Sequence, residues 1–347
     1  MSRNVVHLFD DKKAGGVARM LDFLAGADFG EAGLTQERLY LKRGTWRVPR
    51  LPADVVVTHV ATSLANLPTA IFLRARNPQT RMIHVEHSYS AAFEALNVPN
   101  QDRFRSVLRT FYALFDVVVA VSRGQANWLL AADLVDPERL AIIPPCVDLQ
   151  PFLAASANDG ADCFRLGFVG RLHPQKGVER LVDAMRLTRR RDIVLEIHGD
   201  GPLGDTLRTK AAGDPRIRFA GFAADPASAM AGCDAVVVPS LWEPYGLVCQ
   251  EAHAAGRQVV MANVDGLPEQ AIAGDHVVDS IDPAAWADVF DAMATFRPKP
   301  AANRVGHATL AMSGFVGSWQ SILTGSRPHA PAVSTAQSND QRVSAMA

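Results

Sequence analysis

Short runs of apolar, often β-branched residues alternate along the chain with longer stretches whose apolar positions recur at helical spacing. The runs are Asn4–Phe9, Val55–His59, Met82–Glu86, Val117–Val121, Leu140–Ile143, Arg165–Val169, Val194–His198, Ile217–Phe219, Ala235–Pro239 and Gln258–Met261. A run such as Val117–Val121 has no polar position, as expected for a strand that is buried on both faces of a parallel sheet. Strands that alternate with helices form βαβ units, so the pattern predicts an α/β protein with doubly wound parallel sheets.

The runs fall into two sets that are separated near Pro144 and Pro145, where two prolines stop regular strand pairing. The segment Ala154–Asp162 is rich in small and polar residues, which is typical of a linker between domains. We therefore expect one Rossmann-like domain over residues 1–150 and a second over 151–309. A further helix is expected over 310–324, and residues 325–347 lack apolar periodicity, which predicts a disordered tail.

Composition narrows the choice of function. The 347 residues include 35 basic and 36 acidic side chains, so the chain lacks the basic excess of a nucleic-acid-binding protein. Its four cysteines are scattered, which favours a reducing compartment. The start MSRNVVHLFDDKK does not resemble a signal peptide, and no run of 18 apolar residues could span a membrane. A cytoplasmic protein is expected.

The segment Asp234–Gly256 carries the clearest candidate chemistry. A buried strand leads into a loop with Glu243, and a helix begins near Tyr245–Gly246 and contains Glu251. Both carboxylates are expected at the carboxyl ends of the strands, where open α/β sheets bind ligands. The start of the helix offers unpaired N–H groups to an anion. Two solvated carboxylates beside a helix remain the structural alternative.

This Glu-x7-Glu segment resembles that of the family 4, or group 1, glycosyltransferases, which are retaining enzymes. Three further segments match the family in order, namely Gly167–Gly177, Ile197–Pro202 and Ile217–Phe222. The resemblance covers most of residues 165–275. It implies the GT-B fold, in which two Rossmann-like domains face each other across a cleft and the helix over 310–324 returns to the N-terminal domain. The N-terminal domain would bind the acceptor and the C-terminal domain the nucleotide sugar.

The resemblance also implies a reaction and a set of binding residues. The reaction is the transfer of a sugar from a nucleotide-sugar donor to an acceptor hydroxyl with retention, in polysaccharide or glycolipid synthesis, on a sugar or lipid-linked acceptor. Glu243 would hold the donor sugar and Glu251 the ribose. The backbone of Gly246, Leu247 and Val248 would hold the phosphates and the sugar. Gly221 and Phe222 would line the base.

A departing nucleoside diphosphate develops negative charge that must be neutralised. Metal-dependent transferases often hold a cation with Asp-x-Asp, and this chain contains no such element. Arg171 and Lys176, on the expected loop after the first strand of the second domain, would supply the charge instead, together with a helix N-terminus. We expect neither a metal nor a cofactor. Ordinary surface charges are the alternative for both residues.

The first half of the chain offers two weaker signals. Gly15 and Gly16 follow the first strand and open a helix, so a ligand could approach their backbone closely. A flexible turn is the alternative. His87 directly follows the run Met82–Glu86, and by the resemblance it matches the family histidine that touches the donor sugar. Its imidazole could donate to a sugar oxygen. A histidine that caps the loop is the alternative.

Two other features leave further alternatives. Arg103, Arg105 and Arg109 interleave with apolar residues, and such helices can contact the inner face of a membrane peripherally or be simply solvated. The residues Gly199–Gly204 spell G-x-G-x-x-G, so an NAD-dependent oxidoreductase is an alternative function, although that fingerprint belongs after the first strand. A non-catalytic nucleotide-sugar-binding protein is another. The turn Asp265–Glu269 resembles the family's G-G-x-x-E element, but it begins with Asp.

Overall fold

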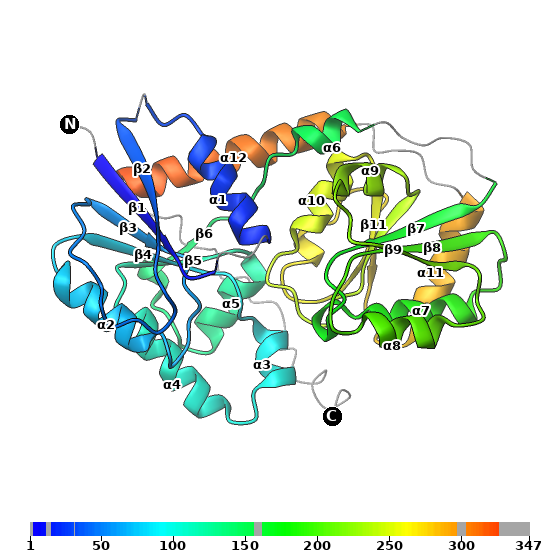
Figure 1. Ribbon diagram of the computed structural model, residues 1–347, viewed down its shortest axis with the longest axis horizontal. Coiled ribbons are helices and arrows are strands. Elements are labelled where there is room, and N and C mark those ends of the chain that lie inside the picture. Colours follow the sequence, from blue (N-terminus) through cyan, green and yellow to red (C-terminus); the bar gives the residue numbers. More distant parts are fainter. Residues whose placement is uncertain (1–2, 12–14, 31, 156–161, 297–302, 326–347) are drawn as a thin grey trace. The chain divides into compact units, whose positions relative to one another are not determined.

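The computed structural model describes residues 3–11, 15–30, 32–155, 162–296 and 303–325. The chain forms two compact units, the first from Met1–Pro145 with Phe315–Ala347 and the second from Cys146–Gly314. Figure 1 shows one sheet flanked by helices in each unit. The first unit ends at Pro145, whereas the sequence pattern predicts the end of the first domain at residue 150. Most of the expected linker, 156–161, and the expected tail beyond Gly325 lie outside the described residues.

The first unit contains a six-stranded sheet in the order β2-β1-β3-β4-β5-β6, and every pairing in it is parallel. Its strands are β1 (Arg3–Phe9), β2 (Leu34–Tyr40), β3 (Val55–Thr58), β4 (Arg81–Glu86), β5 (Val117–Ala120) and β6 (Leu140–Ile142). Its helices are α1 (Gly16–Gly26), α2 (Leu67–Arg76), α3 (Ala91–Asn97), α4 (Gln101–Tyr112) and α5 (Arg123–Ala131), with the short η1 (Pro137–Arg139). Helices α2, α4 and α5 contribute to one apolar core with the sheet.

The second unit contains a six-stranded parallel sheet in the order β12-β11-β10-β7-β8-β9. Its strands are β7 (Phe164–Val169), β8 (Ile193–His198), β9 (Ile217–Gly221), β10 (Ala235–Val238), β11 (Gln258–Ala262) and β12 (His276–Val278). Its helices are α6 (Gln150–Ala154), α7 (Val178–Leu187), α8 (Gly204–Ala211), α9 (Pro226–Ala231), α10 (Leu247–Ala254) and α11 (Pro283–Phe296), with the short η2 (Pro174–Lys176) and η3 (Pro268–Gln270).

All ten strands expected from the sequence are present, and the doubly wound α/β architecture is confirmed. Two strands were missed, and both lie at a sheet edge. Along β2 the sequence LTQERLY buries only Leu34, and β12 is three residues long. An edge strand is covered on fewer sides, so it does not need the continuous apolar run that predicted the others.

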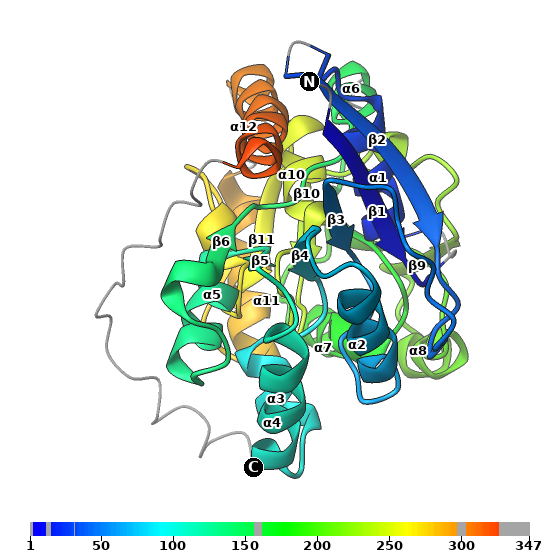
Figure 2. The same cartoon turned by 90° about the vertical axis from the view of Figure 1, so that its left-hand side faces the viewer.

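Helix α12 (Arg304–Thr324) begins six residues before the expected helix, and its carboxyl-terminal half belongs to the first unit. Phe315, Trp319, Ile322 and Leu323 are buried there. The ring of Phe315 stacks on Phe23 of α1 with 5.8 Å between centroids. Figures 1 and 2 show α1 and this half of α12 on one side of the first sheet, with α2 and α4 on the other. No helix in the described part of the chain is long and apolar enough to cross a membrane.

Candidate functional site

The order of strands in the second unit locates a candidate site. β7 lies inside the sheet, with β8 and β9 added in succession on one side of it and β10, β11 and β12 in succession on the other. The order in which strands are added across the sheet therefore reverses between β7 and β10. In open α/β sheets, ligands bind beside the carboxyl ends of the strands at such a switch point. The two loops that begin there carry Arg171 and Lys176 after β7, and Glu243 after β10.

Lys176 and Glu243 meet directly, although 67 residues separate them in sequence. The Lys176 ammonium donates to Oε2 of Glu243, and the Ser240 hydroxyl donates to the same oxygen at 3.0 Å. The two charged side chains are only 20% and 11% exposed. An ion pair this shielded from water leaves a costly unpaired charge when one partner is removed. The structure thus brings together two of the predicted site residues.

A close approach of the two loops makes this pairing possible. The Leu241 N–H donates to the carbonyl oxygen of Gln175 at 2.8 Å. Gly177 has a φ of +62°, and a Cβ built on it would lie 2.1 Å from the carbonyl oxygen of Pro239. A residue with a side chain could not adopt this position without moving the loop. The backbone of the β7–α7 loop therefore lies against the end of β10.

Arg171 lies in the same loop and is exposed. Among the described residues its guanidinium makes no hydrogen bond or ion pair. His173 lies in the same loop, and its pKa is lowered first by burial and then by the positive charges of Arg171 and Lys176. This loop therefore combines a positive potential with an unengaged guanidinium, which suits the binding of an anion.

The amino-terminal end of α10 follows the Glu243 loop. Gly246 precedes the helix with a φ of +93°, and a Cβ on it would lie 2.6 Å from Cδ2 of Leu267. Leu247 and Val248 form the first turn, where backbone N–H groups lack partners within the helix. Glu251 lies one turn further along and is only 2% exposed. The predicted residues Gly246, Leu247, Val248 and Glu251 thus all lie at the amino-terminal end of α10.

Asp265 is a contributor to this region whose role the sequence did not reveal. Its carboxylate accepts a hydrogen bond from the Glu243 N–H at 2.9 Å, and the Gly266 N–H donates to the Glu243 carbonyl oxygen at 3.2 Å. Asp265 has a φ of +45°, a conformation that aspartate adopts more readily than most residues with a side chain. The departure from a glycine-glycine start therefore fixes the backbone of Glu243. The one feature of the sequence that could have indicated this role is the aspartate at a position where the family has glycine.

The loops after β8 and β9 complete this edge of the sheet. Gly221 ends β9 and its carbonyl oxygen accepts from the Gly199 N–H at 2.7 Å. Phe222, the next residue, is 79% exposed, and an exposed aromatic ring can stack on a planar ligand. The Leu172 N–H donates to the Asp200 carbonyl oxygen at 2.9 Å. A Cβ on Gly199 or on Gly201 would lie within 2.5 Å of a carbonyl oxygen of the β7–α7 loop, so the packing of this turn on that loop accounts for these two glycines.

In the first unit, His87 follows β4 and its Nε2 lies 2.9 Å from Nδ1 of His59. Burial, reinforced by His84 and opposed by Glu86, lowers the pKa of His87 to about 4. His87 is therefore neutral near pH 7. Gly15 and Gly16 are exposed at the start of α1, and the loop residues 12–14 before them lie outside the described residues.

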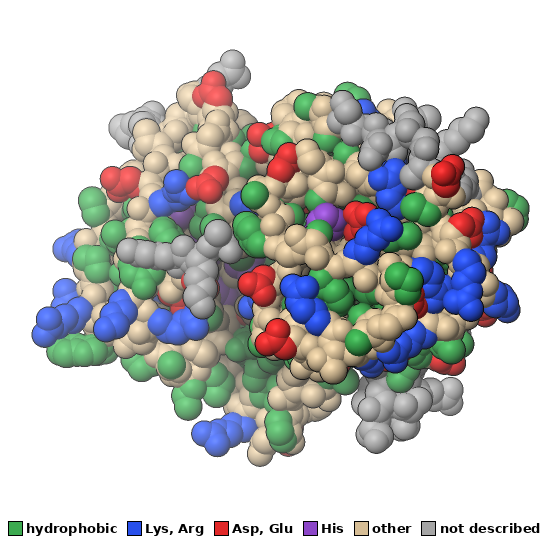
Figure 3. All heavy atoms as spheres, turned by 45° about the vertical axis from the view of Figure 1, so that its right-hand side comes forward, with side chains coloured by type: hydrophobic (Ala, Val, Ile, Leu, Met, Phe, Trp, Pro, Cys, Tyr) green, Lys and Arg blue, Asp and Glu red, His purple; other side chains and the backbone are tan. Residues whose placement is uncertain are grey.

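The basic helix predicted near Arg103 is α4. Arg105 binds Glu94 of α3 through two hydrogen bonds of 2.7 and 3.1 Å. Arg109 donates to the carbonyl oxygen of Asp133 at 2.6 Å. Two of the three arginines therefore hold α4 to neighbouring segments. Figure 3 shows basic and acidic side chains interspersed over the face in view, in keeping with the balanced charge of the chain.

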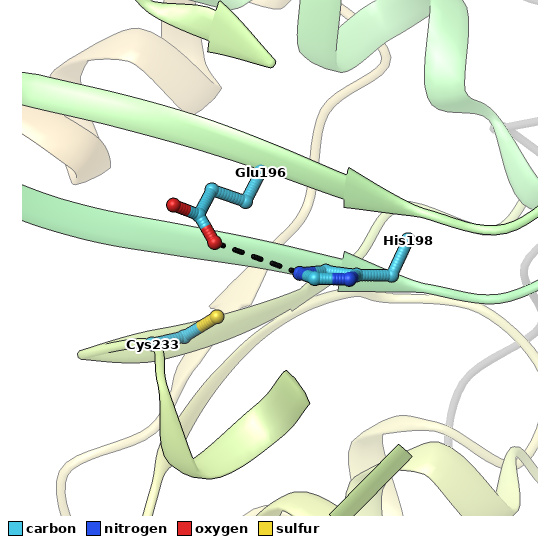
Figure 4. A group of neighbouring side chains, drawn as sticks. All are labelled: Glu196, His198 and Cys233. Atoms are coloured by element: carbon cyan, nitrogen blue, oxygen red, sulfur yellow. Dashed lines mark ion pairs between the residues drawn. The ribbon is translucent and has the colours of Figure 1, made fainter. Parts of the chain in front are cut away.

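One group of side chains in the described ranges has the composition of a metal site, namely Glu196, His198 and Cys233. Glu196 and His198 lie on β8, and Nε2 of His198 is 3.6 Å from Oε2 of Glu196. Figure 4 shows these two side chains with Cys233 nearby. Burial raises the pKa of the Cys233 thiol to about 12, and the thiol donates to the carbonyl oxygen of Ala229 at 3.2 Å. A protonated, hydrogen-bonded thiol is a poor ligand, because metals bind the thiolate. The group contains none of the predicted site residues.

Comparison with known sequences identifies two family models that match this chain in succession. "Glycosyltransferase Family 4" matches residues 33–151, and "Glycosyl transferases group 1" matches residues 163–295. A D-inositol 3-phosphate glycosyltransferase of Actinosynnema mirum is 29% identical over 304 residues, which are 78% of this chain and 64% of that protein. The protein of the same name from Corynebacterium efficiens is 36% identical over 281 residues, 72% of this chain and 58% of that protein. The chain spans about three fifths of the length of these curated relatives.

Solved structures share the fold at low sequence identity. Anabaena Alr3699/HepE in complex with UDP matches with a TM-score of 0.72 and 19% identity, covering 92% of this chain and 99% of that chain. A sucrose-phosphate synthase from Thermosynechococcus elongatus matches with a TM-score of 0.73 and 18% identity, covering 93% and 98%. The predicted GT-B architecture of two parallel α/β sheets is confirmed by these matches.

Proposed function

We propose, from the premise that this chain belongs to the family 4, or group 1, glycosyltransferases, that it transfers a sugar from a nucleotide-sugar donor to an acceptor hydroxyl. The observation that carries the proposal is the meeting of Lys176 with Glu243 beside Arg171 at the switch point of the second sheet. A leaving nucleoside diphosphate gains negative charge as the glycosidic bond breaks. Preorganised cations at that position lower the barrier.

Each residue of the site has a part in this reaction. Arg171 and Lys176 bind the two phosphates, since the first offers a bidentate fork and the second a point charge. Lys176 leaves Glu243 when the phosphates arrive, and Glu243 is then free to accept hydrogen bonds from hydroxyls of the donor sugar. Glu251 binds the ribose hydroxyls. The first N–H groups of α10 bind phosphate and Phe222 stacks on the base.

The proposed transfer retains the configuration of the anomeric carbon and needs no metal. The leaving phosphate itself takes the proton of the acceptor hydroxyl on the same face of the sugar, so no protein nucleophile is required. Before the donor binds, Lys176 and Ser240 hold the Glu243 carboxylate, and in the reaction Glu243 serves as a binding group and not as a nucleophile. The positive charge comes from the β7–α7 loop and the start of α10, and this takes over the role that a metal ion has in other transferases.

The comparisons suggest which substrates to test first. UDP and UDP-glucose are bound in the structures of Anabaena HepE, and the curated relatives are named for D-inositol 3-phosphate. We propose a nucleoside-diphosphate hexose as the donor and a hydroxyl of a sugar, phosphorylated polyol or glycolipid as the acceptor. A glycolipid acceptor would require peripheral contact with a membrane.

The first experiment is a thermal-shift screen with UDP, GDP, ADP and their sugars, followed by an assay of nucleotide release with each acceptor class. A ligand that binds only the native state stabilises it by about 2.7 kcal/mol at a hundred times its Kd. One nucleotide should therefore raise Tm distinctly more than the others. NMR of the product should show the donor's anomeric configuration.

Two outcomes would contradict parts of the proposal. Activity that disappears in EDTA and returns with a divalent cation would contradict a metal-free reaction. Tight binding of a nucleotide sugar, with neither transfer nor hydrolysis for any acceptor class, would favour a non-catalytic binding protein.

A further inference from the structure

Four polar side chains form a continuous row across the first sheet. They are Gln36 of β2, His7 of β1, His59 directly after β3 and His87 directly after β4. These four strands are neighbours in the order β2-β1-β3-β4, so each contributes one member. The contacts are 3.0 Å from Gln36 Oε1 to His7 Nε2, 3.1 Å from His7 Nδ1 to His59 Nε2, and 2.9 Å from His59 Nδ1 to His87 Nε2.

The direction of these hydrogen bonds is set at Gln36. Its side-chain Nε2 donates to the carbonyl oxygen of Leu24 at 3.2 Å, which places Oε1 toward His7. An amide oxygen can only accept, so Nε2 of His7 must carry the hydrogen. A neutral imidazole has one N–H, and Nδ1 of His7 is therefore an acceptor for His59.

Each of the three imidazoles is neutral near pH 7, so each has one N–H donor and one acceptor nitrogen. Burial lowers the pKa of His7 to about 4 and that of His59 well below its ordinary value. His59 therefore donates from Nε2 to His7 and accepts at Nδ1 from His87. His87 then carries its hydrogen on Nε2 and leaves Nδ1 with a lone pair. No residue in the described part of the chain donates to that Nδ1.

Packing holds the rings in this arrangement. His7 and His59 are stacked with 5.4 Å between centroids, and His59 and His87 with 5.2 Å. Trp319 of α12 packs against two of these rings, with its ring centroid 6.0 Å from that of His7 and 6.3 Å from that of His59. An imidazole turned over at any point would oppose two acceptors or two donors in a buried site, which is strongly unfavourable.

We infer that Gln36, His7 and His59 are positioning residues that hold His87 as the Nε2–H tautomer, so that His87 accepts a hydrogen bond from a substrate hydroxyl through Nδ1. This differs from the expectation, based on imidazole chemistry, that His87 donates a hydrogen bond to a sugar oxygen. A group that accepts from a hydroxyl can orient it and draw its hydrogen away from the oxygen. The identity of the hydroxyl, on donor sugar or acceptor, rests on the proposed function, whereas the tautomer does not.

The test is NMR of the full chain labelled with ¹⁵N-histidine at pH 7, with His87 assigned by its absence from His87→Gln. Long-range ¹H–¹⁵N correlations should show one tautomer of His87, protonated at Nε2. Gln36→Leu removes the terminal acceptor and should add a second tautomer at His87. Thr35→Val, a change of the exposed neighbour on β2, is the matched control and should leave the His87 signals unchanged.

Kinetics provide the second readout. If the protein transfers glucose from UDP-glucose, Gln36→Leu and His59→Phe should lower kcat about tenfold, as for one lost hydrogen bond, with the affinity for UDP unchanged. An Nδ1–H tautomer in the unchanged protein, or a Gln36→Leu spectrum identical to it, would overturn the inference. The predicted tautomers without any transferase activity would support the row and contradict the proposed function instead.

Discussion

At the scale of single residues, the site of the second unit depends on charges that meet only in the folded chain. Lys176 and Glu243 form a shielded ion pair, and Asp265 fixes the backbone of Glu243. In the sequence these residues are an isolated lysine, a loop glutamate and a turn aspartate. Their spacing indicates which loops they occupy, but the strand order β7-β10 decides that those loops are adjacent.

Lys176→Ala removes a cation from the place where the leaving diphosphate gains charge. We expect a loss of about 1.5–3 kcal/mol of transition-state stabilisation, which corresponds to a roughly 10- to 150-fold lower transfer rate. The matched control is Lys210→Ala, because Lys210 also forms an ion pair, with Asp183 at 2.7 Å, but on α8. Steady-state kinetics of both variants would test this. Equal transfer rates for the two variants would contradict a role of Lys176 in binding the leaving diphosphate.

Glu243→Ala removes the group proposed to bind the donor sugar but leaves the phosphate and ribose contacts. Transfer should therefore decline much more than the affinity for the free nucleotide, measured by calorimetry with UDP or whichever nucleotide the screen identifies. Glu251→Ala should show the reverse, with a clear loss of nucleotide affinity. The same profile for both variants would mean that the roles of the two glutamates are assigned wrongly.

In the first unit, the ionisation of Glu86 makes the stability of the fold depend on pH. The carboxylate is buried, which opposes ionisation, but His84 at 3.8 Å, the Ser88 N–H and the Thr62 hydroxyl outweigh burial and hold its pKa at about 2. A folded-state pKa below the unfolded one stabilises the fold above about pH 4.5, and this contribution is lost as pH falls toward 2. The contribution is about 3 kcal/mol.

Urea unfolding followed by circular dichroism between pH 2 and 7 would measure this effect. The free energy of unfolding should fall steeply below pH 4.5 in the unchanged protein. Glu86→Gln should be less stable at pH 7 and show a flatter decline in acid. Glu37→Gln, an exposed change on β2, is the control and should follow the unchanged protein. A parallel decline in Glu86→Gln would show that Glu86 does not cause it.

At the scale of elements, the strands that the sequence predicts include every interior strand of both sheets, and the two that it misses, β2 and β12, are edge strands. The loops between elements carry the information that the site requires. Gly177 is where the β7–α7 loop touches Pro239 at the end of β10. A single methyl group at this position would separate two loops whose contact assembles the ion pair.

Gly177→Ala and Gly213→Ala form a matched pair that isolates this contact. Both glycines have a left-handed φ, +62° and +88°, so both changes cost about 1–2 kcal/mol of backbone strain. A Cβ at Gly213 would meet nothing within 4 Å, whereas the one at Gly177 meets backbone. Gly177→Ala should therefore be the less stable variant in urea and should alone lose nucleotide affinity. Equal effects would show that the loop contact has no role in binding.

At the scale of the whole molecule, each of the two units has its own sheet and buried core, and α12 contributes Phe315 and Trp319 to the first. A protein of two units need not unfold in one step. The proposed nucleotide site is built from residues of the second unit alone, so a nucleotide should stabilise that unit specifically.

Trp319→Ala tests the independence of the units. Trp319 is 1% exposed, and the loss of such a side chain costs about 3–5 kcal/mol. The first unit should unfold at lower temperature, whereas nucleotide affinity and the nucleotide-dependent transition should be unchanged. Calorimetry with and without UDP would resolve the two transitions. A matching loss of nucleotide affinity would contradict a site confined to the second unit.

The sequence by itself determined the α/β class, ten of the strands and the family, because these depend on local apolar patterns and on motifs that are continuous in the chain. Tertiary structure alone decided that Lys176 lies on Glu243 and that Asp265 holds the Glu243 backbone. It also decided that Gln36 and three histidines line up across four strands. Each of these contacts joins separate segments, and strand order and register, which no local pattern encodes, bring their side chains within hydrogen-bonding distance.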